Sequence, residues 1–342
     1  MKAMVLNSIT DLDHNSEPLE YSSLPKPVPA DYEVLIKVQA CGVCHTELDE
    51  IEGRTLPAKF PIVPGHQVVG IVESTGKQVT SLKLGARVGV AWIFSSCGKC
   101  SFCLSGRENL CRGFIATGRD VNGGYAEYMT VPESFAYAIP PVFSSAQAAP
   151  LLCAGAVGYR SLKLSGIKDG WNIGLSGFGA SAHLVLQIIK FRFPKTKIFV
   201  FARSENERSF ARELGAFWTG DITDNISDQM DSIIDTTPVW KPVIDSLKKL
   251  KAGGRLIINA IRKEESDKTQ LLNLDFAEHL WMEKEIKSVA NVTRNDVIEF
   301  LSLAAEIPVL PEIQEYKLED ANIVLAELKQ RKIRGAKVLV ME

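Results

Sequence analysis

The sequence has 342 residues, more than one compact hydrophobic core usually accommodates, so two domains are expected. Its hydrophobic content of 46%, charged content of 23% and net charge of −2 are typical of a soluble globular protein and give no sign of a nucleic-acid partner. The apolar runs are too short to span a membrane and the N-terminus has no secretory pattern, so we expect a cytoplasmic protein whose clustered cysteines are metal ligands rather than disulfides.

The first 150 residues are predicted to be rich in β-structure. Short apolar runs at 32–40, 68–72 and 87–92 are separated by glycine and proline turns. Further along the chain, apolar runs alternate with segments of helical period, which predicts an α/β fold with a parallel sheet covered by helices on both faces. The strands expected there are Trp171–Ser176, Lys197–Ala202, Ser232–Asp235, Arg255–Asn259 and Ile286–Ala290.

The C-terminal part, from about residue 292, is predicted to differ from that alternating pattern. A helix is expected over Asp296–Glu306, and a second one near Leu318–Lys332 follows two prolines. The chain then closes with a strand over Ala336–Val340.

Four cysteines within 15 residues form the pattern C-x2-C-x2-C-x7-C, at Cys97, Cys100, Cys103 and Cys111. Four thiolates around zinc would clamp an irregular loop and leave no open coordination position, so we expect a structural zinc. An iron–sulfur cluster and free thiols are the alternatives. A ferredoxin-type run continues with three residues and then Cys-Pro, whereas here seven residues intervene and Arg112 follows.

A glycine-rich turn follows the expected strand 171–176 and opens an apolar helix over 183–193. Its residues are Gly177, Phe178, Gly179, Ala180, Ser181 and Ala182, the pattern G-x-G-x-x-A. The glycines allow a tight turn and a close approach of backbone to pyrophosphate, and the helix N-terminus attracts the phosphate charge. The pattern and its context predict a dinucleotide site, with a glycine-rich turn of another α/β fold as the alternative.

The end of the second strand indicates which dinucleotide binds. An NAD site carries Asp or Glu there for the ribose hydroxyls, but this chain has Ala202, followed by Arg203 and Ser204. The missing carboxylate removes repulsion against a 2′-phosphate, and Arg offers it a planar fork of donors. We therefore expect NADP(H) to be favoured over NAD(H). In the alternative, Arg203 stacks on the adenine or faces solvent.

Taken together, these motifs resemble the zinc-dependent alcohol dehydrogenase family of the medium-chain dehydrogenase/reductase superfamily, over essentially the whole chain. The resemblance also covers Cys41–Glu47, Pro64–Gln67, Gly123–Tyr128 and Ala149–Gly155. It implies a GroES-like β-rich catalytic domain of residues 1–154 and 290–342, with the structural zinc lobe at about 95–113. A Rossmann NAD(P)-binding domain would occupy residues 155–289.

By the same resemblance, Cys41, His66 and Cys153 hold a catalytic zinc, which gives two zinc ions per chain. Three protein ligands leave a position open, where the ion acts as a Lewis acid toward an alcohol oxygen while hydride passes to the nicotinamide. Cys44 is left over in this assignment and is expected to pack as a small buried hydrophobe.

Other roles also follow from the resemblance. Thr46 would hydrogen-bond the substrate oxygen and pass its proton outward, although a Thr there can simply cap a helix. The proton would then reach Asp49 through the ribose hydroxyl, or the relay would end at water. His45 would face the cofactor pyrophosphate. Where relatives commonly have Glu, Asp and His, this chain has Gln67, Glu47 and Asp49, which bears on turnover and pH profile more than on reaction class. Glu47 can still accept a hydrogen bond from a ligand.

The remaining predicted site residues concern the substrate and the nicotinamide. Trp92 matches a position that lines the substrate pocket, where a large aromatic favours a narrow apolar slot; an ordinary core Trp is the alternative. The segment at the end of the last sheet strand is expected near the nicotinamide, with Arg294 either reaching the cofactor or facing solvent. The residues concerned are Ala290, Asn291, Val292 and Arg294.

The expected function is a zinc-dependent oxidoreductase that interconverts small primary alcohols, aromatic ones among them, and aldehydes or ketones with NAD(P). A homodimer or homotetramer is expected from the resemblance. The alternatives are a zinc-independent reductase of activated double bonds and a non-enzymatic relative that keeps only the cofactor site. The number of zinc ions per chain separates these possibilities.

Overall fold

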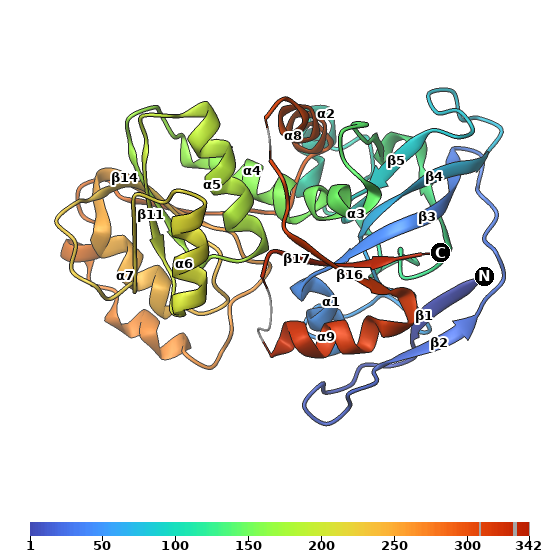
Figure 1. Ribbon diagram of the computed structural model, residues 1–342, viewed down its shortest axis with the longest axis horizontal. Helices are drawn as coiled ribbons and strands as arrows, with labels where there is room; N and C mark the ends of the chain where they lie inside the picture. Colours follow the sequence, from blue (N-terminus) through green and yellow to red (C-terminus); the bar gives the residue numbers. More distant parts are fainter. Residues whose placement is uncertain (308, 331–333, 342) are drawn as a thin grey trace. The chain divides into compact units, whose positions relative to one another are not determined.

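The computed structural model describes residues 1–307, 309–330 and 334–341, and these fall into two compact units (Figure 1). The first unit contains Met1–Ala156, Val292–Glu306 and Leu310–Glu342; the second contains Val157–Asn291 together with Ile307 and Val309. The unit boundaries after residues 156 and 291 lie two residues from those expected at 154 and 289. Ile307 and Val309, expected with the first unit, belong to the second.

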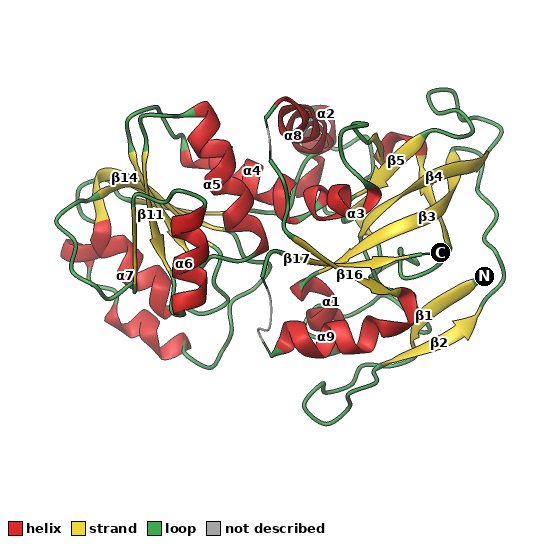
Figure 2. Cartoon of the chain, viewed as in Figure 1, coloured by secondary structure: helices red, strands yellow, loops and turns green. Residues whose placement is uncertain are grey.

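Within the described ranges, the first unit is built on a seven-stranded sheet (Figure 2). The strand order is β16-β17-β3-β4-β5-β9, with β8 paired to β3. These strands are β3 (Glu33–Val43), β4 (Gln67–Thr75), β5 (Arg87–Val90), β8 (Tyr128–Pro132), β9 (Ala136–Ala138), β16 (Ile313–Lys317) and β17 (Ala336–Val340). The antiparallel pairing of β17 with β3 joins the chain's last strand to one of its first and explains why the C-terminal segment belongs to this unit.

Short elements surround this sheet. The two-stranded pairs are β1 (Lys2–Leu6) with β2 (Leu19–Ser23), and β6 (Ile93–Ser95) with β7 (Ile115–Ala116). The helices are α1 (His45–Ile51), α2 (Ser101–Leu104), α3 (Ser145–Ala148), α8 (Arg294–Glu306) and α9 (Ala321–Lys329). The helix expected near 318–332 is thus shorter and follows a 3₁₀ turn, Leu318–Asp320; residues 331 and 332 lie outside the described ranges.

The second unit holds a parallel sheet in the order β12-β11-β10-β13-β14-β15. Its strands are β10 (Asn172–Ser176), β11 (Lys197–Phe201), β12 (Trp218–Gly220), β13 (Met230–Asp235), β14 (Leu250–Ile258) and β15 (Glu285–Ser288). The helices of this part are α4 (Ala154–Ser165), which begins in the first unit, α5 (Ala180–Arg192), α6 (Glu205–Glu213) and α7 (Lys241–Lys249). This order is that of a Rossmann fold, so the predicted α/β class is confirmed.

The topology positions the functional segments. The strand order reverses direction between β10 and β13, and ligands of such sheets bind at the carboxyl ends of the strands beside that reversal. The short strand β12 was not expected from the sequence. Among the helices of the described residues, none is both long and apolar enough to cross a membrane.

Candidate functional site

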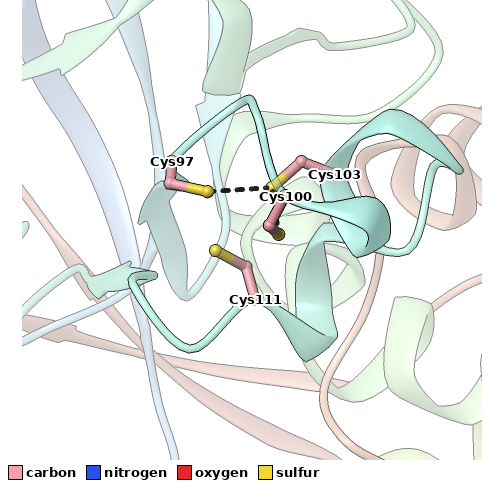
Figure 3. A group of neighbouring side chains, drawn as sticks. All are labelled: Cys97, Cys100, Cys103 and Cys111. Atoms are coloured by element: carbon pink, nitrogen blue, oxygen red, sulfur yellow. Dashed lines mark hydrogen bonds between the residues drawn. The ribbon is translucent and has the colours of Figure 1, made fainter.

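The four predicted cysteines of the first unit converge on one point (Figure 3). The Sγ atoms of Cys97, Cys100, Cys103 and Cys111 all lie within 4.8 Å of one another. Sulfurs about 2.3 Å from zinc in a tetrahedron are about 3.8 Å apart. The Sγ atoms of Cys97 and Cys103 are separated by 3.8 Å, and those of Cys100 and Cys103 by 3.5 Å. This group therefore fits a fully enclosed tetrahedral metal ion.

Local backbone geometry forms this lobe and anchors it. Gly98 and Gly106 adopt φ of +68° and +66°, which residues with side chains rarely do. The buried Glu108 carboxylate accepts hydrogen bonds from Arg294 N (2.7 Å) and Nε (3.1 Å), which ties the lobe to the start of α8. Arg294, predicted as a cofactor residue, thus has a partner within its own unit, and its contact with a cofactor stays a prediction.

A second group of metal-ligating side chains is formed by Cys44, His66 and Cys153, whose ligand atoms lie within 4.8 Å of one another. Cys44 caps the N-terminus of α1, His66 directly precedes β4, and Cys153 follows a 3₁₀ turn. Cys44 Sγ is 3.5 Å from His66 Nε2. Three ligand groups leave a tetrahedral ion one position for a water or a substrate oxygen.

The prediction that Cys41 belongs to this group and that Cys44 merely packs is wrong. Cys41 lies inside β3, fully buried, with its Sγ 3.6 Å from Gly42 O. A Cβ on Gly65 would come within 3.0 Å of that sulfur, and one on Gly124 within 3.2 Å, so the thiol fills a tightly packed gap. Burial raises the pKa of Cys41, and Glu47 raises it further, which keeps this thiol neutral.

Glu47 orients the histidine of this group. Its Oε1 lies 2.6 Å from His66 Nδ1, and its Oε2 accepts a hydrogen bond from Cys44 N at 2.9 Å. Burial opposes a charge on His66, but Glu47 and then Cys44 outweigh it and raise the pKa of the imidazole. With Nδ1 turned to Glu47, Nε2 remains for a metal ion. This contact with His66 is the one expected from the family resemblance, in which Glu47 takes the place of an Asp.

The loop before β4 requires glycine to place His66. Gly65 adopts φ of +98°, and a Cβ there would lie 2.3 Å from the ring of the buried Tyr125. A Cβ on Gly118 would lie 2.8 Å from Gly65 N, so the 117–118 backbone packs directly against this loop. Gln67 is buried at the start of β4 and contacts Gly42, which leaves no room for a larger residue at position 42.

The predicted proton-relay residues all lie on α1. Thr46 is nearly buried and its backbone N donates to Cys44 Sγ at 3.4 Å. Asp49 is buried and accepts a hydrogen bond from Arg54 Nε at 2.7 Å. The sequence pattern did not indicate Arg54, although a basic residue shortly after an expected relay carboxylate is a usable signal. His45 is exposed at the first position of the helix.

In the second unit, the glycine-rich turn joins β10 to α5. Gly177 adopts φ of +81°, and a Cβ there would lie 2.7 Å from Thr236 Oγ1. Gly179 has an ordinary φ of −103°, and a Cβ there would meet no atom of the described residues within 4 Å. Packing within the described residues therefore does not explain the glycine at position 179. A ligand that lies close to this backbone would explain it.

The other predicted residues of this turn support its shape. Phe178 is buried against Phe210, with ring centroids 5.6 Å apart. Ala180 is the first residue of α5, and Ser181 Oγ accepts from Asn259 Nδ2 at 3.3 Å. Asn259 follows β14, so this hydrogen bond joins two segments at the carboxyl edge of the sheet.

The end of β11 places Ala202 in the core and Arg203 and Ser204 at the surface. Ser204 caps α6 by accepting from Glu207 N. Arg208 donates to Ala202 O at 2.7 Å and to Arg203 O at 3.0 Å, a role that the sequence pattern did not indicate. The three predicted residues therefore form a fixed turn at the carboxyl edge of the sheet.

The predicted nicotinamide segment follows β15. Ala290 is exposed, and Asn291 adopts a left-handed φ of +53°. Because parallel strands end at the same edge, these two residues lie at the edge that carries the glycine-rich turn. Val292 is buried and belongs to the first unit.

Trp92, the predicted substrate residue, is buried in the short link between β5 and β6. Its ring contacts Phe114, with centroids 5.3 Å apart, and carries the guanidinium of Arg119 at 5.1 Å from its centroid.

Comparison with known proteins gives this arrangement a context. Residues 30–141 match the family model described as the alcohol dehydrogenase GroES-like domain. The chain is 38% identical over 329 residues to the Mycobacterium tuberculosis (strain CDC 1551 / Oshkosh) protein named "Probable alcohol dehydrogenase AdhA", covering 95% of this chain and 93% of that protein. An alcohol dehydrogenase of Geobacillus stearothermophilus is 32% identical over 355 residues, covering 100% and 99%. A cinnamyl alcohol dehydrogenase structure from Sorghum bicolor gives a TM-score of 0.86 at 25% identity, covering 99% and 97%.

Proposed function

The chain belongs to the zinc-type alcohol dehydrogenase family of the medium-chain dehydrogenase/reductase superfamily, and we propose that it interconverts small primary alcohols, aromatic ones among them, with their aldehydes, and related alcohols with ketones. The observation that carries this proposal is the group of Cys44, His66 and Cys153, which offers three ligands and leaves one position open. A reductase that works without zinc has no need of such a group.

The chemistry of these side chains suits zinc. Cys44 and Cys153 supply thiolates and His66 supplies Nε2, with Nδ1 held by Glu47. A zinc ion bound there supplies a Lewis acid for the oxygen of the alcohol or the carbonyl. The four-cysteine lobe would hold a second ion with a purely structural role, because four thiolates leave no position open.

Residues of α1 are proposed to handle the proton. Thr46, two positions after Cys44, is the proposed hydrogen-bond partner of the substrate oxygen. Asp49 is the proposed acceptor one turn further along, and Arg54 keeps its carboxylate in place at 2.7 Å. His45, exposed at the start of the same helix, is proposed to face the cofactor pyrophosphate.

The cofactor is proposed to be NADP(H) in preference to NAD(H). The open space over Gly179 supports a dinucleotide whose pyrophosphate lies at the N-terminus of α5. Ala202 brings no carboxylate to repel a 2′-phosphate, and the exposed Arg203 beside it offers a charged fork of donors. Ala290 and Asn291, after β15, are the proposed contacts of the nicotinamide, which accepts or donates the hydride.

A homodimer or a homotetramer is proposed as well. All four residues of β15, the last strand of its sheet in the described structure, are exposed. Large apolar side chains are exposed in the same part of the chain: Ile261, Leu272, Leu274, Phe276, Trp281, Met282 and Ile286. A strand edge beside such residues is typical of an interface, and a second copy would cover both. A cytoplasmic location stays a prediction.

The deciding experiment is a panel of alcohols and aldehydes assayed with NADH and NADPH side by side, together with the zinc content of the purified protein. We expect two zinc ions per chain and turnover of primary alcohols with NADP⁺. Zinc without any turnover would favour a non-enzymatic relative. Turnover of activated double bonds by a protein that lacks the second zinc ion would favour the zinc-independent reductase.

A further inference from the structure

Glu50 is a buried carboxylate that no role assigned so far explains. It lies three residues after Glu47 on α1 and therefore on the same face of the helix. Its side chain is 1% exposed, and neither carboxylate oxygen has an aligned hydrogen-bond partner among the described residues. Because a buried carboxylate without partners is costly, a Glu at this position points to a specific interaction.

The indole of Trp92 is the donor that complements it. Trp92 Nε1 is also buried without an aligned partner within the described ranges. Burial raises the pKa of Glu50 and Glu47 raises it further, whereas His66 and the indole N–H of Trp92 lower it. A buried acceptor and a buried donor that both lack an aligned partner complement each other, and the effect of the indole N–H on Glu50 indicates that the two side chains are neighbours.

The remainder of the Trp92 ring is already held by its neighbours. Arg119 stacks over the ring at 5.1 Å from the centroid and is itself fixed by Asp120, with Nη2 and Oδ2 2.6 Å apart. Phe114 contacts the indole at a centroid distance of 5.3 Å. These contacts pack against the ring but supply no acceptor for its N–H.

We propose that Glu50 is a positioning residue for Trp92: a carboxyl oxygen of Glu50 accepts the indole N–H and fixes the orientation of the ring. This inference rests on the proposed function, because it assumes that Trp92 lines the alcohol pocket. A fixed ring presents a flat apolar wall, which favours flat aromatic substrates over small aliphatic ones. Glu50 would therefore act on substrate selection through Trp92, without touching the substrate.

The direct test is an NMR measurement on the purified protein labelled with ¹⁵N at its five tryptophan indoles. Trp92 is the one tryptophan of the first unit, and W92F assigns its signal by removing it. The amide oxygen of E50Q can still accept the N–H, so we expect its Trp92 signal to stay near that of the native protein. E50M has no acceptor, and its Trp92 signal should move. The other four indoles are internal controls.

Two results would overturn the inference: a Trp92 signal that does not move in E50M, or one that moves as far in E50Q as in E50M. This readout needs no turnover, so it decides whether Glu50 holds the Trp92 indole even if the proposed function fails. If E50M does not fold, E50L serves in its place. Should neither variant fold, the decision passes to the kinetics of W92F described next.

The kinetic test compares benzyl alcohol with ethanol. E50M would leave the buried indole N–H without its acceptor, so we expect its KM for benzyl alcohol to rise about tenfold, with kcat and the KM for ethanol much less affected. W92F should show the same selective rise, and the double variant no additional rise. E50Q should remain near the native values. Equal effects on both alcohols, or native selectivity in W92F, would refute the assigned role.

Discussion

His66 Nδ1 lies 2.6 Å from Glu47 Oε1, with both side chains buried in the first unit. The other oxygen of the same carboxylate accepts from Cys44 N, the backbone of a second residue of the metal-ligand group. One carboxylate therefore positions two of the three residues of this candidate metal site. Because Glu47 also caps α1, the helix start and the ligand geometry depend on the same side chain.

We predict that E47Q weakens binding of the proposed catalytic zinc by about 10- to 100-fold, the usual cost of losing an orienting partner of a ligand histidine. The amide can still accept one hydrogen bond, but it cannot compensate charge on the imidazole. Competition with a chelator, followed as zinc released per chain, measures the effect. The four-cysteine lobe supplies the control, since its zinc should be released at the native rate. Uniform loss of both ions would indicate unfolding instead.

The exchange of roles between Cys41 and Cys44 yields a second prediction. C44S should retain one zinc ion per chain and lose alcohol turnover, because it removes a ligand thiol. C41S should retain both ions and most of its turnover while the protein becomes less stable, because the Cys41 thiol only fills space under Gly65. Zinc content by mass spectrometry and thermal melting distinguish the two variants. Loss of zinc from C41S with retention in C44S would contradict this assignment.

The choice between Cys41 and Cys44 is the part of the site that the sequence did not allow us to predict. Spacing predicted the four-cysteine lobe because its ligands are local, and the structure brings those thiols together. Cys44, His66 and Cys153 come from a helix cap, a strand start and a 3₁₀ turn, so no local pattern joins them. The family motif narrowed the choice to one short segment, and only the packing of Cys41 inside β3 decided between its two cysteines.

The fold was predicted more completely than the site. Runs of apolar residues gave the strands of the parallel sheet, because strands buried on both faces are apolar throughout. β12 was missed since its three residues form no such run. Arg54 was missed although its position five residues after Asp49 was a usable signal. Arg208 was missed because it donates to backbone carbonyls, which no side-chain pattern marks. Glu50 was missed because its burial without an aligned partner is visible only in the packed structure.

The cofactor preference gives a third prediction. A202D places a carboxylate at the end of β11, where it would repel a 2′-phosphate and accept the ribose hydroxyls of NAD. We expect the ratio of kcat/KM for NADPH over NADH to fall by at least tenfold, a change of about 1.4 kcal/mol. A202N, which has nearly the same size and no charge, is the matched control and should cause a smaller shift. An unchanged ratio in A202D would show that this turn does not set the choice.

The pKa of Glu50 predicts how stability depends on pH. Burial, followed by Glu47, raises this pKa well above its usual value of 4.5, so the native protein holds a proton that the unfolded chain has released. Stability from this group is therefore present at low pH and lost as pH rises toward the folded pKa. E50Q removes the titration, so its free energy of unfolding relative to the native protein should increase between pH 5 and pH 8. Urea unfolding at a fixed zinc concentration measures this difference.

Glu52, at the C-terminal end of the same helix, provides a control of opposite sign. Burial acts against its charge, but Lys329 and Arg54 outweigh burial and lower the pKa of this carboxyl. Its contribution to stability is therefore present above the unfolded pKa and lost as pH falls. E52Q should consequently lose stability relative to the native protein as pH rises toward 4.5, and the difference should stay level between pH 5 and pH 8, where E50Q gains stability. If the stability of both variants relative to the native protein changed with pH in the same way, the burial argument for Glu50 would be refuted. Such a result would reflect a general effect of removing a carboxylate from α1.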